Sequence, residues 1–303
     1  MDRDAVLMKI LLLGANGQLG RELARQLPSV GSVTAFTRSE LDITDSDAVI
    51  QKVTSLGPDV IVNAAAYTAV DKAEEEKELA NAINSGAVGV LGELANKVGA
   101  WLIHYSTDYV FDGKKPSSYI ETDLPNPINV YGASKLAGEV AITAENCKHI
   151  IFRTTWVIGK DGQNFAKTIL RLAAERESLS VINDQRGVPT SPALITKVTI
   201  DALKAIEQKN AWPIGIYHLA PRGSSTWHEV ARTLIIFAEK CGMPLNTQAD
   251  NIRAIATSEY PTPAKRPLNS QLDTRKLRDQ LSFHLPDWKG DFLTVVAEIV
   301  KKS

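Results

Sequence analysis

Short apolar runs alternate with longer amphipathic stretches through the first half of the chain. Runs typical of buried strands lie at Lys9–Leu13, Val33–Phe36, Val60–Asn63, Trp101–Tyr105 and His149–Arg153. The stretches between them predict helices at Gln18–Leu27, Ser46–Leu56, Glu74–Val98 and Tyr131–Ala144. Short strands that alternate with helices are typical of βαβ units, in which right-handed crossovers place helices on both faces of a parallel sheet. The pattern therefore predicts an α/β protein with a doubly wound parallel sheet.

The pattern changes after about Trp156. Residues 157–191 predict a helix and then a strand that ends in a loop rich in glycine and proline. A helix over Pro192–Glu207 and a strand over Ile214–Leu219 follow. Residues 258–277 are rich in proline and polar side chains and precede a helical C-terminus. We interpret the second half as a smaller lobe that is interleaved with the last strand of the sheet.

The composition excludes several classes of protein. A hydrophobic content of 44%, with 23% charged residues and a net charge of −1, argues against non-specific binding of nucleic acid or of anionic membranes. No stretch reaches the roughly 20 apolar residues of a membrane span. The first residues carry acidic side chains and predict a short leader, not a signal peptide. Two cysteines, and five histidines without ligand spacing, predict neither a disulfide framework nor a metal site, and we expect a cytoplasmic protein.

Three glycines, Gly14, Gly17 and Gly20, follow the first predicted strand and precede a helix. Glycine permits the turn, lets backbone N–H groups approach a pyrophosphate and allows close packing of the helix on the strand. The helix N-terminus adds a positive dipole end. Taken alone, the motif fits a turn without a ligand almost as well. Its place after the first strand of a βαβ unit favours dinucleotide binding.

The end of the second predicted strand bears on the choice of nicotinamide cofactor. NAD-preferring enzymes usually carry an acidic residue there, whereas this strand ends in Phe36 and is followed by Thr37 and Arg38. A guanidinium at Arg38 can pair with a 2′-phosphate, which favours NADPH. A solvated Arg38, with Asp42 serving NADH, is the alternative, and use of both cofactors fits the sequence as well.

These motifs divide the chain into two parts. We expect residues 1–156 to form a dinucleotide-binding Rossmann domain, to which a last helix and strand return within residues 192–220. Residues 157–191 and 221–303 then form the smaller, interleaved α/β lobe that binds substrate.

Tyr131 and Lys135 lie four residues apart in a predicted helix, and so share one face of it. An ammonium group beside a phenol favours the phenolate, so we expect Lys135 to lower the pKa of Tyr131 towards neutrality. Such a tyrosine can exchange a proton with a carbonyl or alcohol oxygen. A pair on the helix surface is the alternative for this motif alone.

A polar group of residues stands where the fourth predicted strand meets the carboxyl edge of the sheet, the edge at which doubly wound folds bind ligands. Ser106 ends the strand, Thr107 offers a hydroxyl to the same carbonyl that Tyr131 would protonate, and Asp108 can hold substrate hydroxyls. Each of the three residues could instead cap a turn. Their order along one sheet with the glycine loop and Tyr131 favours a catalytic site.

With GxxGxxG, a hydroxyl residue after a central strand and YxxxK, the chain resembles the extended short-chain dehydrogenase/reductase family. Within it, the stretches VNAAAYTAVDKAE, HYSTDYVFDG, NVYGASKLAGE, FRTTWV, NFAKTILRLA, LSVINDQRGVPT and YPTPAKRPLNS resemble reductases of nucleotide sugars. The resemblance implies reduction of the 4-keto group of dTDP-4-dehydro-β-L-rhamnose by NADPH or NADH. It makes Tyr131 the proton donor, Lys135 the ligand of the nicotinamide ribose, and Thr107 the group that polarises the carbonyl.

Other roles follow from the resemblance alone. It places Asp108 and Trp156 against the sugar, and Arg266 beside the phosphates of the nucleotide, although Arg266 could equally be a surface residue. The pyrophosphate is expected on the glycine loop, at Gly14, Gly17, Gln18, Leu19 and Gly20. The adenine is expected between Asp42 and Ile43, and the rest of the cofactor cleft is expected to be lined by Ala65, Ala66, Tyr67 and Tyr105.

Some relatives bridge a dimer through Mg²⁺ held by glutamates. Glu22 matches one such position, but Ser191–Leu194 offers no carboxylate where its partner would be expected. We therefore expect no bound metal, and leave a homodimer as a possibility.

Two other functions fit parts of the sequence. One is a sugar-nucleotide epimerase or dehydratase on the same scaffold. The other is a non-catalytic regulatory subunit, like the β subunit of methionine adenosyltransferase. The intact set of Tyr131, Lys135 and Thr107 favours an enzyme over a regulatory subunit, and net consumption of NAD(P)H would separate a reductase from an epimerase or a dehydratase.

Overall fold

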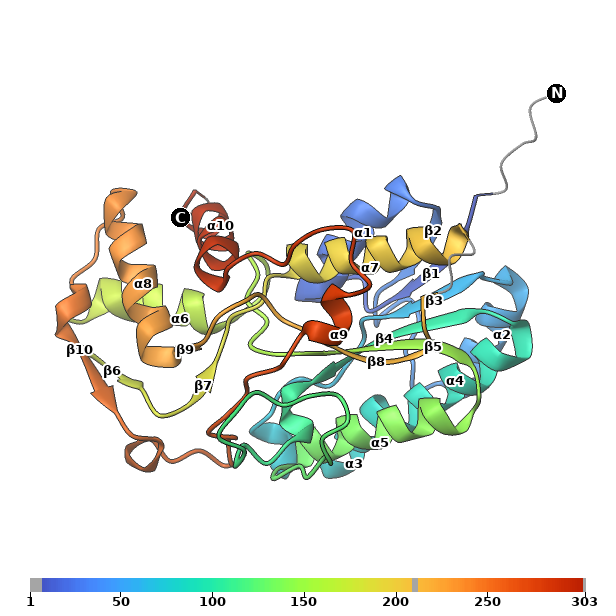
Figure 1. Ribbon diagram of the computed structural model, residues 1–303, viewed down its shortest axis with the longest axis horizontal. Helices are drawn as coiled ribbons and strands as arrows, with labels where there is room; N and C mark the ends of the chain where they lie inside the picture. Colours follow the sequence, from blue (N-terminus) through green and yellow to red (C-terminus); the bar gives the residue numbers. More distant parts are fainter. Residues whose placement is uncertain (1–6, 209–211, 302–303) are drawn as a thin grey trace.

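A six-stranded parallel sheet forms the centre of the larger part of the molecule (Figure 1). The computed structural model describes residues 7–208 and 212–301, so the predicted leader over residues 1–6 lies outside it. The strand order is β2-β1-β3-β4-β5-β8. The strands span Ser32–Phe36 (β2), Lys9–Leu13 (β1), Val60–Asn63 (β3), Trp101–Thr107 (β4), Lys148–Thr154 (β5) and Gly215–Leu219 (β8). The order reverses between β1 and β3, which is where open α/β sheets bind their ligands.

Helices cover both faces of this sheet (Figure 1). One face carries α1 (Gln18–Gln26) and α7 (Pro192–Glu207), and the other carries α2 (Ser46–Leu56), α4 (Ala87–Val98) and α5 (Val130–Ala144). Side chains alternate along β1: Ile10 and Leu12 pack into the cluster under α1 and α7, whereas Leu11 and Leu13 pack into the cluster under α2 and α4. A strand buried on both faces must be apolar throughout, which is why these runs could be recognised in the sequence.

The helix predicted over Glu74–Val98 is confirmed as a continuous helical run only from Lys77, and the prediction missed a π turn within it. The chain forms a 3₁₀ turn at Lys72–Glu74, a short helix α3 at Lys77–Asn81, a π-helical turn at Ala82–Gly86 and then α4. Asn84 lies in the π turn with a fully buried side chain, which binds the backbone N–H and C=O of Tyr67 at 2.9 and 3.0 Å. The amide pairs two backbone groups of a neighbouring loop, and the π turn is the backbone geometry that places it there.

Two strands extend further than predicted. β4 continues from Tyr105 to Thr107, and β5 continues from Arg153 to Thr154. The last residues of both strands are polar, so the apolar pattern of the sequence ends before the backbone pairing between the strands does. Thr107 pairs with Thr154 at the carboxyl edge of the sheet, which places the end of the HYST stretch in regular structure.

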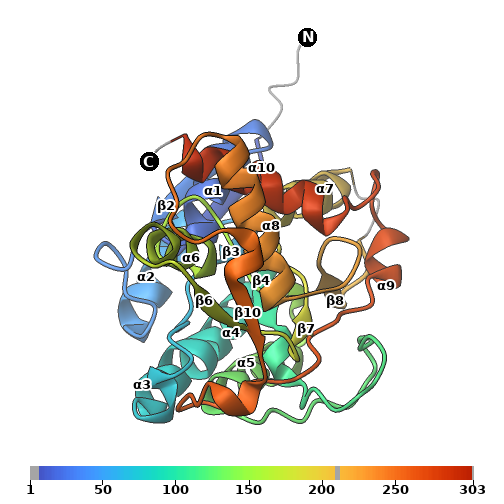
Figure 2. The same cartoon turned by 90° about the vertical axis from the view of Figure 1, so that its left-hand side faces the viewer.

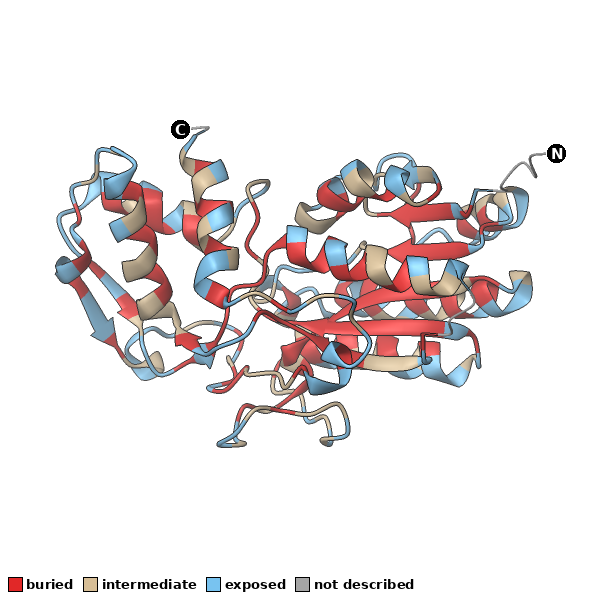
Figure 3. Cartoon of the chain, turned by 45° about the horizontal axis from the view of Figure 1, so that its top comes forward, coloured by how far each residue is buried: buried red, intermediate tan, exposed pale blue. Residues whose placement is uncertain are grey.

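A second group of elements lies beside the sheet (Figures 1 and 2). It contains the helices α6 (Phe165–Glu175), α8 (Trp227–Lys240) and α10 (Trp288–Val300), the parallel pair β6 (Leu179–Ile182) and β10 (Ile252–Ile255), and the short antiparallel pair β7 (Arg186–Gly187) and β9 (Ser225–Thr226). These helices share one hydrophobic cluster, and the short helix α9 (Arg275–Arg278) packs against β8. Buried residues concentrate in the central sheet and on the inner faces of the helices in both groups of elements (Figure 3).

Two further findings bear on the expected class of protein. Among the helices that the structure describes, none combines the length and the apolar character needed to cross a membrane. Both cysteines are free, Cys147 in the interior and Cys241 at the surface.

Candidate active site

The glycine loop packs closely against neighbouring backbone. Gly14 has a φ of +78°, and a Cβ on it would lie 2.6 Å from the backbone nitrogen of Ala65. A Cβ on Gly20 would lie 1.9 Å from the Gly14 oxygen, so α1 can approach the loop only with glycine at that position. Gly17 caps α1 and contributes no side-chain hydrogen bond to the helix N-terminus. The loop therefore presents backbone at the switch point of the sheet.

A pocket of about 210 Å³ lies beside this loop, and seven of the predicted cofactor ligands line it. They are Gly14, Gly17, Arg38, Asp42, Ile43, Ala65 and Ala66. The other lining residues are Asn16, Leu41, Ala64 and Ile83. Residues from the ends of β1, β2 and β3 thus meet in one concave site, as expected for an adenine dinucleotide in this fold.

Both candidates for recognition of the ribose lie at the rim of this pocket. Arg38 is largely exposed and its Nε lies 3.4 Å from Asp42 Oδ2. Asp42 Oδ1 accepts hydrogen bonds from the backbone N–H and the hydroxyl of Thr44, which lower the pKa of Asp42. An exposed ion pair of this length contributes little to stability, so a ligand can displace it at low cost.

Four predicted cofactor ligands lie elsewhere or face other groups. Gln18 Oε1 accepts from Gly159 N at 3.1 Å and from Asn164 Nδ2 at 3.0 Å, and so ties α1 to the segment before α6. Leu19 packs against the cluster under α1 and α7. The Tyr67 hydroxyl donates to Glu76 at 2.7 Å. Tyr105 is buried with its hydroxyl 2.8 Å from Thr199 Oγ1, and burial raises its pKa.

The first turn of α5 places Tyr131 against the end of β4. Asn129 caps this helix by accepting a hydrogen bond from Gly132 N at 2.7 Å. A Cβ on Gly132 would lie 2.1 Å from the Tyr109 oxygen, so the helix start is pressed against the turn that follows Thr107. The ring of Tyr131 meets the ring of Tyr109 edge to face, with centroids 5.8 Å apart. The Thr107 hydroxyl, which donates to Asp108 Oδ1 and accepts from Tyr109 N, lies near enough to the Tyr131 phenol to lower its pKa.

The expected lowering of the Tyr131 pKa is wrong for the protein without cofactor. Burial raises the pKa of Tyr131 to about 12, the charge of Asp108 adds to the rise, and the hydrogen bond from Thr107 opposes it. Burial also lowers the pKa of Lys135 to about 8, against the effect of Glu139. The Lys135 amine contacts His104 Nε2 at 3.1 Å. Desolvation of both groups outweighs the attraction that their spacing predicted.

Asp108 and Trp156 lie in strained or costly environments. Asp108 is buried, its Oδ1 accepts from Thr107 at 3.1 Å, and its Oδ2 has no hydrogen-bond partner within the described part of the chain. Burial raises the pKa of Asp108 to about 7. Trp156 follows β5 with a φ of +43°, a conformation that side chains other than glycine rarely adopt. Its ring stacks on Trp227 at the start of α8, with centroids 3.7 Å apart.

Arg266 is engaged in an ion pair with the larger part of the molecule. Its Nη2 lies 2.7 Å from Asp71 Oδ2, and its Nη1 donates to the Ala264 oxygen at 2.7 Å. The neighbouring Lys265 oxygen accepts from Asn129 Nδ2 at 2.8 Å. The predicted contact of Arg266 with phosphate therefore stays a prediction, whereas its contact with Asp71 joins two distant segments.

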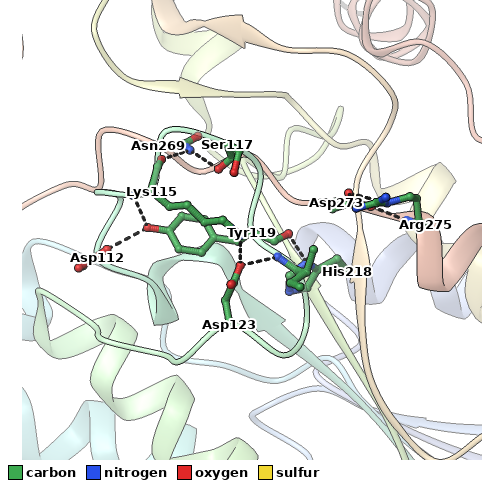
Figure 4. A network of polar contacts seen from close by, with 10 residues as sticks. Asp112, Lys115, Ser117, Tyr119, Asp123, His218, Asn269, Asp273 and Arg275 are labelled. Atoms are coloured by element: carbon green, nitrogen blue, oxygen red, sulfur yellow. Dashed lines mark hydrogen bonds and ion pairs between the residues drawn. The ribbon is translucent and has the colours of Figure 1, made fainter.

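The same segment continues past the site and binds the loop between β4 and α5 (Figure 4). Asn269 Nδ2 donates to the backbone oxygens of Lys115 and Ser117 at 2.7 and 2.9 Å. Within the loop, the Tyr119 hydroxyl donates to Asp112 at 2.9 Å. The backbone oxygen of Tyr119 lies 3.0 Å from Nδ1 of His218, which belongs to β8. Sequence reasoning missed this network, because its members are scattered and carry no spacing motif.

The residues considered for a magnesium bridge have other partners. Glu22 binds Arg25 and Gln26 within its own helix. Ser191 donates from its backbone nitrogen and from its hydroxyl to Asp291, at 2.9 and 2.6 Å. Over the described ranges, no group of three or more His, Cys, Asp or Glu side chains is arranged to hold a metal ion.

Comparisons with known proteins agree on one family. The family model described as the RmlD substrate binding domain matches residues 8–301. The dTDP-4-dehydrorhamnose reductase of Escherichia coli (strain K12) is 47% identical over 286 residues, which cover 93% of this chain and 95% of that protein. A crystal structure of dTDP-4-dehydrorhamnose reductase from Bacillus anthracis in complex with NADP has a TM-score of 0.86 and 37% identity, covering 96% of this chain and 99% of that one. An orthologue from Clostridium acetobutylicum gives the same TM-score, identity and coverage.

Proposed function

Because this chain belongs to the family described as the RmlD substrate binding domain, we propose that it reduces the 4-keto group of dTDP-4-dehydro-β-L-rhamnose and yields dTDP-β-L-rhamnose. The observation that carries the proposal is the meeting of Tyr131, Thr107 and Asp108 at the carboxyl edge of the same sheet whose strands β1, β2 and β3 end in the pocket at the glycine loop. The protein is accordingly an oxidoreductase of nucleotide-sugar biosynthesis.

The residues present fit a nicotinamide dinucleotide. A Cβ on Gly14 or on Gly20 would clash with backbone, and the pocket beside them is lined by small and apolar residues together with the polar side chains of Asn16, Arg38 and Asp42. When bound, the cofactor supplies the hydride for the C4 carbonyl. NADPH is the cofactor we assign, as in the Bacillus anthracis relative, with the exposed Arg38 available for a 2′-phosphate.

Tyr131 supplies the proton in this reaction. A pKa of about 12 keeps the phenol protonated at neutral pH, which is the state that a general acid requires. The Thr107 hydroxyl lies beside the phenol and donates to Asp108 Oδ1 in this structure, and it would turn to donate to the same substrate oxygen when the sugar is bound. Lys135, as an ammonium ion, stabilises the phenolate that remains after the proton has left.

Asp108 and Trp156 bind the sugar. The unpartnered Oδ2 of Asp108 is an acceptor that a substrate hydroxyl can satisfy, and such a bond offsets the cost of burying the carboxyl group. Trp156 offers an apolar ring face, held by the stack with Trp227, between the sheet and the smaller lobe of residues 157–191 and 221–303.

The decisive assay mixes purified protein with dTDP-4-dehydrorhamnose and NADPH or NADH, and follows cofactor oxidation together with the sugar product. A reductase consumes one cofactor for each sugar. Release of an isomerised or dehydrated sugar without net oxidation would instead indicate an epimerase or a dehydratase. Isolation in a stoichiometric complex with a synthetase, without turnover, would indicate a regulatory subunit. A cytoplasmic location and a homodimer stay predictions.

Tyr131→Phe tests the role of the phenol. We expect kcat to fall by at least about 100-fold with little change in KM, because the hydroxyl acts in the transition state and the ring is retained. Tyr109→Phe is the matched control, since the two rings are in contact and Tyr109 is assigned no proton. A Tyr131→Phe enzyme with near-normal kcat would remove Tyr131 from the mechanism.

A further inference from the structure

Three polar side chains form a buried chain behind the catalytic tyrosine. Asn63 on β3 lies with its Nδ2 3.2 Å from His104 Nδ1 on β4. His104 Nε2 lies 3.1 Å from Lys135 Nζ on α5. All three side chains are at most 1% exposed. Neither Asn63 nor His104 has been given a role so far, although His104 contacts Lys135 and Asn63 contacts His104.

The direction of these hydrogen bonds follows from the backbone. The Ala65 N–H lies 3.1 Å from the Asn63 amide and can only donate, so the atom facing it is Asn63 Oδ1. Asn63 Nδ2 then faces His104 and donates to Nδ1. A neutral imidazole that accepts at Nδ1 carries its proton on Nε2.

That proton points at Lys135. A hydrogen bond from His104 Nε2–H to Lys135 Nζ requires a lone pair on the lysine nitrogen, which an ammonium ion does not have. We propose that Asn63 and His104 are positioning residues that favour the neutral amine of Lys135 in the protein without cofactor, so that Lys135 takes up a proton only by giving up the hydrogen bond from His104. This inference rests on the role proposed above for Lys135.

The charges around Lys135 are consistent with this assignment. Glu139, one turn along α5, favours the ammonium form, but its carboxylate is shared with Arg153 at 2.9 and 3.2 Å and with Ser106 at 2.5 Å. Burial keeps the pKa of His104 well below its usual value, so the ring is neutral. Tyr131 is protonated and Asn84, in the π turn, carries no charge. Burial favours the neutral amine of Lys135 as well.

The consequence for turnover is a dependence on the protonation of Lys135. Only the ammonium form stabilises the Tyr131 phenolate, so the rate falls as pH rises through the pKa of Lys135. In the protein without cofactor this pKa is about 8. The orientation of the Asn63 amide therefore sets the upper pH limit of the enzyme, through His104.

The first test uses nitrogen NMR of the full chain, without cofactor and with ¹⁵N-labelled histidine. His104, identified by the signal that is lost in His104→Gln, is expected as the neutral Nε2–H form. Its Nε2 shift should respond near pH 8, and that response should vanish in Lys135→Met. A His104 proton on Nδ1, or a shift that ignores Lys135, overturns the proposal. Neither result depends on the substrate. A failure of this proposal would therefore appear in the NMR spectra, whereas a failure of the proposed reductase activity would appear in the assay of cofactor oxidation.

The second test reverses the chain of hydrogen bonds with Asn63→Asp. A carboxylate accepts from both the Ala65 N–H and His104 Nδ1–H, which leaves His104 Nε2 as an acceptor for the ammonium ion. We expect the Nδ1–H form in NMR, and an upward shift of about one pH unit in the alkaline limb of kcat.

Asn84→Asp is the matched control, because this buried amide binds Tyr67 and Ser134 and does not contact His104. It should leave His104 as the Nε2–H form. Equal shifts of the alkaline limb in both variants, or an Asn63→Asp protein with an unchanged tautomer and limb, would show that the amide does not act through His104.

Discussion

Asp108, the residue proposed to bind the sugar, is a buried carboxyl group whose raised pKa links protonation to stability. Its carboxyl group titrates near pH 7 in the folded protein, against 3.8 as the ordinary value. The folded state therefore holds a proton, between about pH 4 and pH 7, that the unfolded state has released. The contribution of Asp108 to the free energy of unfolding is therefore largest below about pH 4, and it is lost as pH rises to about 7.

Asp108→Asn removes that dependence. We expect the free energy of unfolding of the variant, relative to the wild type, to rise between pH 5 and pH 8 by up to about 3 kcal/mol, because the amide never ionises. Urea unfolding at both pH values measures it. Asp112→Asn is the control, since hydrogen bonding to Lys114 N lowers the pKa of Asp112 and both states are ionised in this range. An equal effect at pH 5 and pH 8 for Asp108→Asn would contradict the raised pKa.

Which residues could be predicted depends on whether their partners are close in sequence. Tyr131 and Lys135 share a helix face, so their spacing alone suggested the site. His104 sits inside an apolar strand, and its partner Lys135 is 31 positions away, so no local period connects the two. Arg266 is further still, at 195 positions from Asp71, which is why its ion pair could not be foreseen.

At the level of elements, the close packing of α5 on the π turn determines the position of the helix that carries Tyr131 and Lys135. A Cβ on Gly138 would lie 2.1 Å from the backbone oxygen of Asn84. Apolar runs predicted the strands because parallel strands are buried on both faces, whereas the π turn depends on what Asn84 binds and left no trace in the helical period. The helix was predicted without a π turn for that reason.

Gly138→Ala tests this contact. We expect a loss of about 1–3 kcal/mol in the free energy of unfolding, because the obstacle is backbone and α5 must move. Gly89→Ala on α4 is the matched control: its Cβ would meet Ala141 at 3.4 Å, so the change should be neutral, or stabilising by about 0.5–1 kcal/mol. Thermal or urea unfolding compares the two. Equal effects would mean that α5 can shift away from the π turn without cost.

For the whole molecule, contacts between distant segments close the site. The Arg266–Asp71 ion pair and the bond from Asn129 to Lys265 fix the segment after β10 against the sheet domain, next to the start of α5. Asn269 continues the attachment on the loop between β4 and α5. The fold class could be predicted because it depends on local periods, whereas this closure depends on single polar contacts.

Substitutions at both ends of the ion pair separate two roles for Arg266. If Arg266 acts by fixing the segment, Asp71→Ala and Arg266→Ala should raise the KM for the sugar nucleotide by similar factors, and the double variant should be little worse than either. We expect this result, with a coupling of about 1 kcal/mol. If Arg266 binds the phosphates instead, Asp71→Ala should leave KM unchanged or lower it, while Arg266→Ala raises it.

The interleaving of the chain also orders events during synthesis. β8 adds to the sheet only after α6 and β6 have been made, and residues 264–269 reach Asp71 and Asn129 from near the end of the chain. During synthesis, the glycine loop and Tyr131 emerge from the ribosome long before β8 and residues 264–269 have been made. A nascent or truncated chain therefore carries Tyr131 and the glycine loop without the late segment that binds Asp71 and Asn129, so we expect it to be inactive until residues 264–269 have been made.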